Sequence, residues 1–187
     1  MSRATRPSVP GYQAELARKL ADSAQRPMEP TWLALAWQGV PAMLPLAQAG
    51  EIFAPTPLQR LPHTQPWVRG VALWRGSLLL VLDWVRLYGC APGHSAQQGE
   101  ASEYWVSCNP ALGLEAALCA DRLLGLRSAA ELAFEPWQPQ RPGLRQAARD
   151  RHGQRWLELD LQALAQSAAF LDPRSPEFAR PQPAAPA

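Results

Sequence analysis

The sequence lacks long apolar runs, and this absence limits where the chain can act. No uninterrupted apolar stretch in its 187 residues approaches the length of about 20 that a bilayer-spanning helix needs. The N-terminal stretch MSRATRPSVPGYQAEL is basic, but it has no apolar core of the kind found in secretion signals. We therefore expect a cytoplasmic protein with no direct membrane insertion.

Basic residues are sparse and scattered. Lys19 is the only lysine, and the formal net charge of +2 is too small to require an anionic partner. The arginines do not gather on one strand face, so we expect no nucleic acid as a partner. A small barrel that binds single-stranded nucleic acid stays open as an alternative, because aromatic side chains that could stack on bases are present.

Signals of catalysis or metal binding are also absent. There is no G-x-S-x-G elbow, no phosphate-binding G-x-x-x-x-G-K-[ST] loop and no G-x-G-x-x-G turn. Cys90, Cys108 and Cys119 are an odd number without metal-like spacing, which is typical of free thiols in a reducing compartment. We expect no enzyme, no metal and no cofactor. An enzyme would need a pocket in which polar groups from distant segments converge.

The histidines also show no spacing typical of a metal site. His63, His94 and His152 lie in three separate loop-like stretches, without a cysteine or carboxylate nearby at ligand spacing. We expect them to face solvent.

The chain does contain many short apolar segments separated by turn residues. Glycine marks tight turns at Gln38-Gly39, at Arg75-Gly76 and at the end of the run 150–153. This pattern predicts an all-β fold with little helix. One segment, 113–120 (GLEAALCA), also has helical propensity. The ten predicted strands are 31–37, 40–45, 47–53, 68–74, 77–83, 103–109, 113–120, 122–126, 144–150 and 154–160.

The most informative segment is 66–83, PWVRGVALWRGSLLLVLD. The runs 71–74 and 78–82 are almost entirely apolar, which predicts two strands with little exposure on either side of the turn Arg75-Gly76-Ser77. Gly70 and Gly76 stand where a backbone must bend or approach something closely.

This segment resembles the G-V-x-N-L-R-G-x-x-x-P-V-x-D-L signature of CheW-like domains, the adaptor modules of bacterial chemosensory arrays. Other segments resemble the family's pattern in the same order: AGEIF at 49–53, LPHTQPWVRG at 61–70, ADRLLGL at 120–126 and RWLELDL at 155–161. The resemblance spans roughly residues 31–171. The segment PWVRG, together with the N-terminal extension, favours the PilI type, which serves twitching motility. The chain departs from the signature at Leu73-Trp74, at Leu80 and at Trp84.

The resemblance implies two small five-stranded SH3-like barrels packed on each other, with the loop 90–102 crossing between them. The implied domain covers 30–172. Before it, 1–29 carries Tyr12, Leu16 and Leu20 on one face of a predicted amphipathic helix. After Asp160 a short helix should cap the fold through Leu161, Leu164 and Phe170. The Pro- and Ala-rich run 173–187 is expected to be a flexible tail.

Glu51 and Arg75 are the first candidates for a binding surface. Each is a lone charge among apolar residues, and a mutual ion pair would resolve the cost of that placement. The pair can serve recognition or can merely fix the geometry of the first barrel, and the sequence favours neither. In the resembled family, the positions of Glu51, Gly70, Arg75 and Gly76 belong to the region that engages the signalling tip of chemoreceptors.

Tryptophans supply further candidates. Trp37, Trp105 and Trp156 lie in apolar strands and are predicted to be core residues, whereas Trp67, Trp74 and Trp137 are candidates for surface contacts.

The resemblance implies a non-catalytic adaptor that couples a methyl-accepting chemoreceptor to a CheA-type histidine kinase, recruited to receptor arrays at the inner membrane. A degenerate paralogue that keeps the fold but has lost one partner is the closest alternative.

Overall fold

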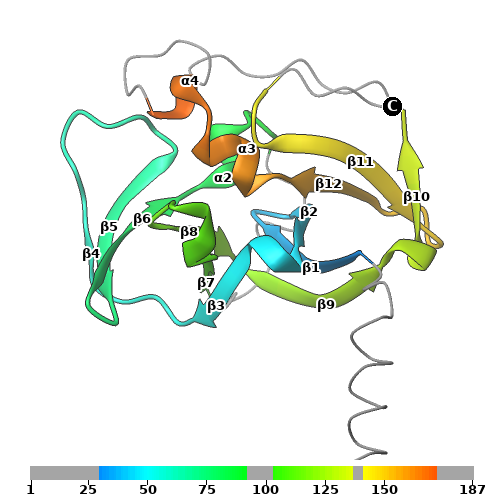
Figure 1. The fold of residues 1–187 in the computed structure, drawn as a ribbon, viewed down its shortest axis with the longest axis horizontal. Coiled ribbons are helices and arrows are strands. Elements are labelled where there is room, and N and C mark those ends of the chain that lie inside the picture. Colours follow the sequence, from blue (N-terminus) through cyan, green and yellow to red (C-terminus); the bar gives the residue numbers. More distant parts are fainter. Residues whose placement is uncertain (1–29, 92–102, 137–140, 172–187) are drawn as a thin grey trace, which may run out of the picture.

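The computed structural model describes residues 30–91, 103–136 and 141–171, and most of these residues lie in strands (Figure 1). Within these ranges, twelve strands form two six-stranded sheets. The first sheet has the order β10 (Leu132–Glu135), β11 (Leu144–Asp150), β12 (Arg155–Leu159), β2 (Val40–Pro45), β1 (Thr31–Trp37), β9 (Arg122–Ser128). The second has the order β3 (Ala49–Phe53), β7 (Tyr104–Cys108), β8 (Ala116–Ala120), β6 (Ser77–Leu82), β5 (Val68–Trp74), β4 (Leu58–Gln59). The predicted all-β fold is confirmed.

The two edge strands of each sheet are neighbours in sequence. A single capped turn, Ala129–Glu131, separates β9 from β10, and four residues, 54–57, separate β3 from β4. Because such short connections hold the first and last strands together, each sheet curls into a barrel-like unit. The sequence prediction of five strands per unit missed the short edge strands β4 and β10, which carry little apolar pattern of their own.

The chain passes between the sheets at two points. It leaves the first sheet after β2 through the 3-10 turn Leu46–Gln48, and it returns after β8 at Asp121. The predicted crossing at 90–102 is wrong, because β6 before it and β7 after it belong to the same sheet. Strands of the first sheet therefore come from both ends of the domain, and this interleaving ties the two units together.

Three apolar clusters fill the inside of each sheet and the space between the sheets. Successive side chains of a strand point to opposite faces, so one strand can contribute to two clusters. In β1, Leu33 and Leu35 face the cluster between the sheets, whereas Trp32 and Ala34 face the interior of the first sheet. In β8, Leu118 lies in the cluster between the sheets. Strands buried on both faces need no polar alternation, which accounts for continuous apolar runs such as TWLALAW and AALCA.

Short helices cover the junction between the two sheets (Figure 1). They are α2 (Trp84–Leu87), α3 (Leu161–Ala165) and α4 (Ala168–Leu171). Leu161, Leu164 and Phe170 are buried in the cluster between the sheets, as predicted. The predicted single C-terminal helix is divided in two, because the Ser167 hydroxyl accepts a hydrogen bond from the Phe170 amide and starts a new turn.

The predicted turns are confirmed. Gln38 and Gly39 have φ of 51° and 75°, and Arg75 and Gly76 have φ of 48° and 86°. Positive φ at both central residues matches the twist of two-residue hairpins. Gly153, with φ of 78°, closes the β11–β12 hairpin by donating to the Asp150 carbonyl.

Several predictions concern residues outside the described ranges: the N-terminal helix in 1–29, the tail 173–187, His94 and Trp137. None of the helices in the described ranges has the length and apolar character that a membrane span requires.

Candidate interaction surface

The tip of the β5–β6 hairpin exposes two leucines side by side. Leu73 and Leu78 are cross-strand partners, and they are 64% and 60% exposed. The sequence predicted little exposure for both strands, and at the tip this is wrong. Ala72 and Leu79 point into the second sheet, whereas Leu73 and Leu78 on the opposite face are left exposed by the described part of the chain. An exposed apolar pair of this kind is suited to contact with another protein.

Glu51 in β3 and Arg75 at the turn of the β5–β6 hairpin form the predicted ion pair. Arg75 donates from Nη1 to Glu51 Oε1, and the Trp74 indole donates to Glu51 Oε2 at 3.2 Å. The Arg75 guanidinium also lies 5.5 Å from the centre of the Trp74 ring. We call these three residues, with Leu73 and Leu78, the hairpin-tip surface.

The reasoning that led to this pair needs a correction. The Arg75 and Glu51 side chains are 69% and 48% exposed, so burial of charge does not force them together. An exposed ion pair contributes only about 0.2 to 1 kcal/mol to stability. Trp74 adds a stronger attachment, because it stacks on Phe53 with centroids 4.1 Å apart and planes 10° apart. These contacts hold the hairpin tip against β3.

The two candidate glycines have different surroundings. Gly76 is exposed at the tip, and a Cβ there would meet no atom within 4 Å. Gly70 is buried, and a Cβ there would lie 2.4 Å from the Gln59 carbonyl oxygen. The close approach at Gly70 is therefore made by β4 of the same chain, and this intramolecular contact is sufficient to explain the glycine.

Trp67 is not on the surface, contrary to the prediction. It is 5% exposed and stacks on Phe170 with centroids 5.2 Å apart, so it joins α4 to the core. Trp105 and Trp156 are core residues, as predicted. Trp37 was predicted to be core as well, but it is only half-buried, and the Arg69 guanidinium covers it at 5.4 Å from the ring centre.

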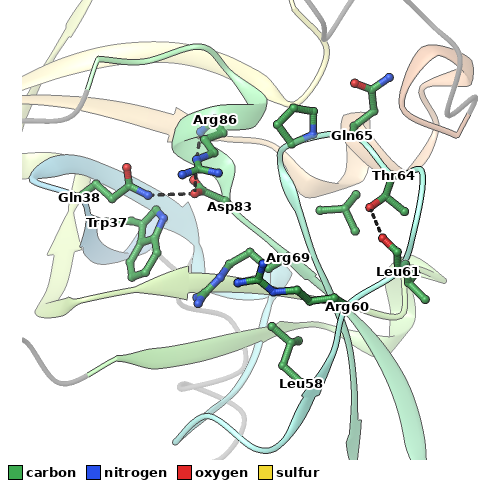
Figure 2. A pocket seen from close by; sticks show the side chains of 12 residues that line it. Trp37, Gln38, Leu58, Arg60, Leu61, Thr64, Gln65, Arg69, Asp83 and Arg86 are labelled. Carbon is green, nitrogen blue, oxygen red and sulfur yellow. Dashed lines mark hydrogen bonds and ion pairs between the residues drawn. The ribbon is translucent and has the colours of Figure 1, made fainter.

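A pocket of about 450 Å³ lies at the other end of the same hairpin (Figure 2). Trp37 and Gln38 of the β1–β2 hairpin form one side, and residues of β4 and of the start of β5 form the other. Buried Asp83 accepts hydrogen bonds from Gln38 Nε2 at 2.9 Å and from the Arg86 amide at 3.0 Å. Asp83 thereby caps α2 and links it to the first sheet. No local sequence pattern predicts this pocket, because only the pairing of β4 with β5 brings Arg60 and Arg69 together.

The chemistry available in the described residues is poor in reactive groups. Burial raises the pKa of Cys90 to about 11 and the pKa values of Cys108 and Cys119 to about 12, so these thiols stay protonated at neutral pH. His63 and His152 are exposed and far from one another in the chain. Within the described ranges, no three His, Cys, Asp or Glu side chains come together as metal ligands would.

Two curled six-stranded β-sheets, interleaved along the chain, define the class of fold. The family model of the CheW-like domain matches residues 38–169, and the chain therefore belongs to the CheW-like domain family. Among solved structures, the chain is similar to the scaffolding protein TtCheW from Thermoanaerobacter tengcongensis. That alignment has a TM-score of 0.61 at 14% identity and covers 78% of this chain and 93% of TtCheW. A comparison with curated proteins returned no match.

Proposed function

We propose that this protein is a non-catalytic adaptor that couples a methyl-accepting chemoreceptor to a CheA-type histidine kinase. Membership of the CheW-like family supports an adaptor, and TtCheW is described as a scaffolding protein. The observation that carries the proposal is the hairpin-tip surface, where an exposed leucine pair stands beside the Glu51–Arg75 pair. Residues 30–172 form the adaptor domain in this proposal, with 1–29 and 173–187 as flanking segments.

The hairpin-tip surface would receive the signalling tip of the receptor. Leu73 and Leu78 offer apolar area that is removed from water on binding, and this burial supplies most of the affinity in such contacts. Glu51 and Arg75 form a polar rim beside it, which restricts the orientation of the partner. Gly76 leaves the turn without a side chain, so a receptor helix can approach the backbone there.

The kinase would bind one of the two barrels at a separate surface. A rigid body with two faces can hold a kinase domain next to a receptor and change its activity when the receptor changes conformation. We further propose a cytoplasmic protein recruited to receptor arrays at the inner membrane, with its output in twitching motility, as in the PilI type. The segments PWVRG and 1–29 support this last assignment.

Arg75→Glu tests the receptor site. The substitution places two carboxylates opposite each other and removes the rim cation, so affinity for a receptor signalling-tip fragment should fall at least tenfold while the circular dichroism spectrum stays native. Arg151→Glu, at an exposed turn on the other sheet, is the matched control and should bind as the wild type does. Wild-type affinity in the Arg75 variant would reject the site.

The charge-swapped double variant Glu51→Arg with Arg75→Glu separates recognition from a structural role. The swap restores the ion pair but reverses the rim, so a recognition surface stays defective. Full recovery of receptor binding would show that the pair only fixes the hairpin geometry.

A further inference from the structure

The pocket beside Trp37 has features that the adaptor function does not use. It lies where Val68 pairs with Leu82, whereas the hairpin tip lies where Trp74 pairs with Ser77, so the two sites occupy opposite ends of one hairpin. Its volume of about 450 Å³ falls within the range of roughly 300 to 1,000 Å³ typical of small-ligand sites.

Three guanidinium groups line this pocket, and they differ in their partners. Arg69 is paired with Glu103 and donates to Cys119 Sγ at 3.3 Å. Arg86 Nε lies 3.3 Å from Asp83 Oδ2. For the third guanidinium, that of Arg60, the described residues offer no ion pair or hydrogen bond. Figure 2 shows the side chains of Arg60, which follows β4, and of Arg69 in β5 extending into the same space.

The charge count indicates the charge of the ligand. Glu103 balances Arg69 and Asp83 balances Arg86, so among the residues that the structure describes the Arg60 guanidinium is the one charge of the pocket lining without an ion-pair partner. One free guanidinium beside a second, partly engaged one suits a singly charged, planar carboxylate, which accepts two parallel N–H donors. A doubly charged phosphate would leave a surplus negative charge next to Asp83.

The remaining walls indicate the shape of the ligand. Leu58, Leu61, Val68 and the Trp37 indole line the pocket together with the uncharged polar side chains of Gln38, Thr64 and Gln65. These groups can cover a few methylene groups but offer no further free charge. Thr64 already donates its hydroxyl to the Leu61 carbonyl at 3.0 Å. This lining fits an anion with a short aliphatic body.

We propose that the pocket binds a monocarboxylate, with the carboxylate on Arg60 and Arg69 and the aliphatic part against Leu58 and Leu61. Two sources carry this chemistry: a free short-chain acid, or a glutamate side chain presented by a protein. The site would give the adaptor an input that is separate from its hairpin tip.

Titration of the full ¹⁵N-labelled chain with sodium butyrate at constant ionic strength tests the proposal. We expect saturable shifts of the Trp37 indole N–H and the Arg60 Nε–H signals. Arg60→Gln should weaken binding about tenfold or more, as expected for a lost hydrogen bond to a charged group. Arg151→Gln is the matched control and should leave the affinity unchanged, because Arg151 is exposed at a distant turn.

Three further probes complete the experiment. Neutral butanol and inorganic phosphate should both bind more weakly than butyrate. The tripeptide acetyl-Ala-Glu-Ala-amide identifies the source: tighter binding than butyrate assigns a protein side chain, and weaker binding assigns a free acid. The proposal is overturned by the absence of saturable shifts with butyrate and peptide alike, by unchanged butyrate affinity in Arg60→Gln, or by phosphate or butanol binding as tightly as butyrate.

Discussion

Replacement of Gly70 by alanine tests whether β4 of the chain itself occupies the space above this residue. Gly70 has φ of 146°, and its Cβ would lie 2.4 Å from the Gln59 carbonyl oxygen and 2.9 Å from the carbonyl carbon. Backbone strain of this kind costs about 1 to 3 kcal/mol, and an extra methyl group in a packed site costs about 1 to 3 kcal/mol more. We expect Gly70→Ala to lower the free energy of unfolding by about 2 to 6 kcal/mol.

The matched control is Gly76→Ala at the exposed turn of the same hairpin. Its φ of 86° is also unfavourable for alanine, but a Cβ there meets no atom within 4 Å. The expected loss is only the conformational part, about 1 to 2 kcal/mol. Gly153→Ala, with φ of 78° and the same open surroundings, should behave as Gly76→Ala does.

Urea denaturation followed by tryptophan fluorescence measures all three variants on one scale. The order of stability should be wild type, then the two exposed variants together, then Gly70→Ala. A Gly70→Ala variant as stable as Gly76→Ala would refute the reasoning, because it would mean that nothing in the folded chain fills the space above Gly70.

Three further predictions follow from packing and burial. Trp67→Ala should destabilise the protein by about 3 to 5 kcal/mol in the same urea titration, because the indole is buried against α4. A loss below about 1 kcal/mol would favour the surface position that the sequence suggested. The double variant Leu73→Ser with Leu78→Ser should change stability by less than about 1 kcal/mol but weaken receptor binding; an unchanged affinity would remove the leucines from the surface. Burial raises the pKa of Cys108 from 9.0 to about 12, so between these pH values the unfolded chain loses a thiol proton that the folded chain keeps. The free energy of unfolding should therefore fall as the pH rises through this range, and a Cys108→Ala variant should show a smaller fall.

The sequence was most informative where the turn chemistry and the apolar pattern agree. The strands 31–37, 40–45 and 144–150 were predicted with the boundaries observed, because glycine turns or prolines delimit them. The β5–β6 hairpin was also predicted, since Arg75-Gly76 adopts the two-residue turn that its residues favour.

The sequence was least informative about exposure. An apolar strand end such as Leu73 or Leu78 has the same local pattern whether or not another element covers it. Only the tertiary arrangement decides that these two side chains are exposed to solvent. The reverse error occurred at Trp67, where a proline-bounded loop suggested a surface residue but the distant Phe170 packs on the ring.

The candidate site was predicted in part for the same reason. Charge and isolation in the sequence were enough to pair Glu51 with Arg75, although both lie on the surface. No local signal could join Arg60 to Arg69 and Trp37, because their proximity depends on the pairing of β4 with β5 and on the contact between the two sheets.

The most direct test of the adaptor function is a titration calorimetry series with two partners, the regulatory domain of the cognate CheA-type kinase and a receptor signalling-tip fragment. The account predicts saturable binding of each partner alone and of both together, with Arg75→Glu losing the receptor and retaining the kinase. Binding of neither partner, or competition between the two for one surface, would contradict it.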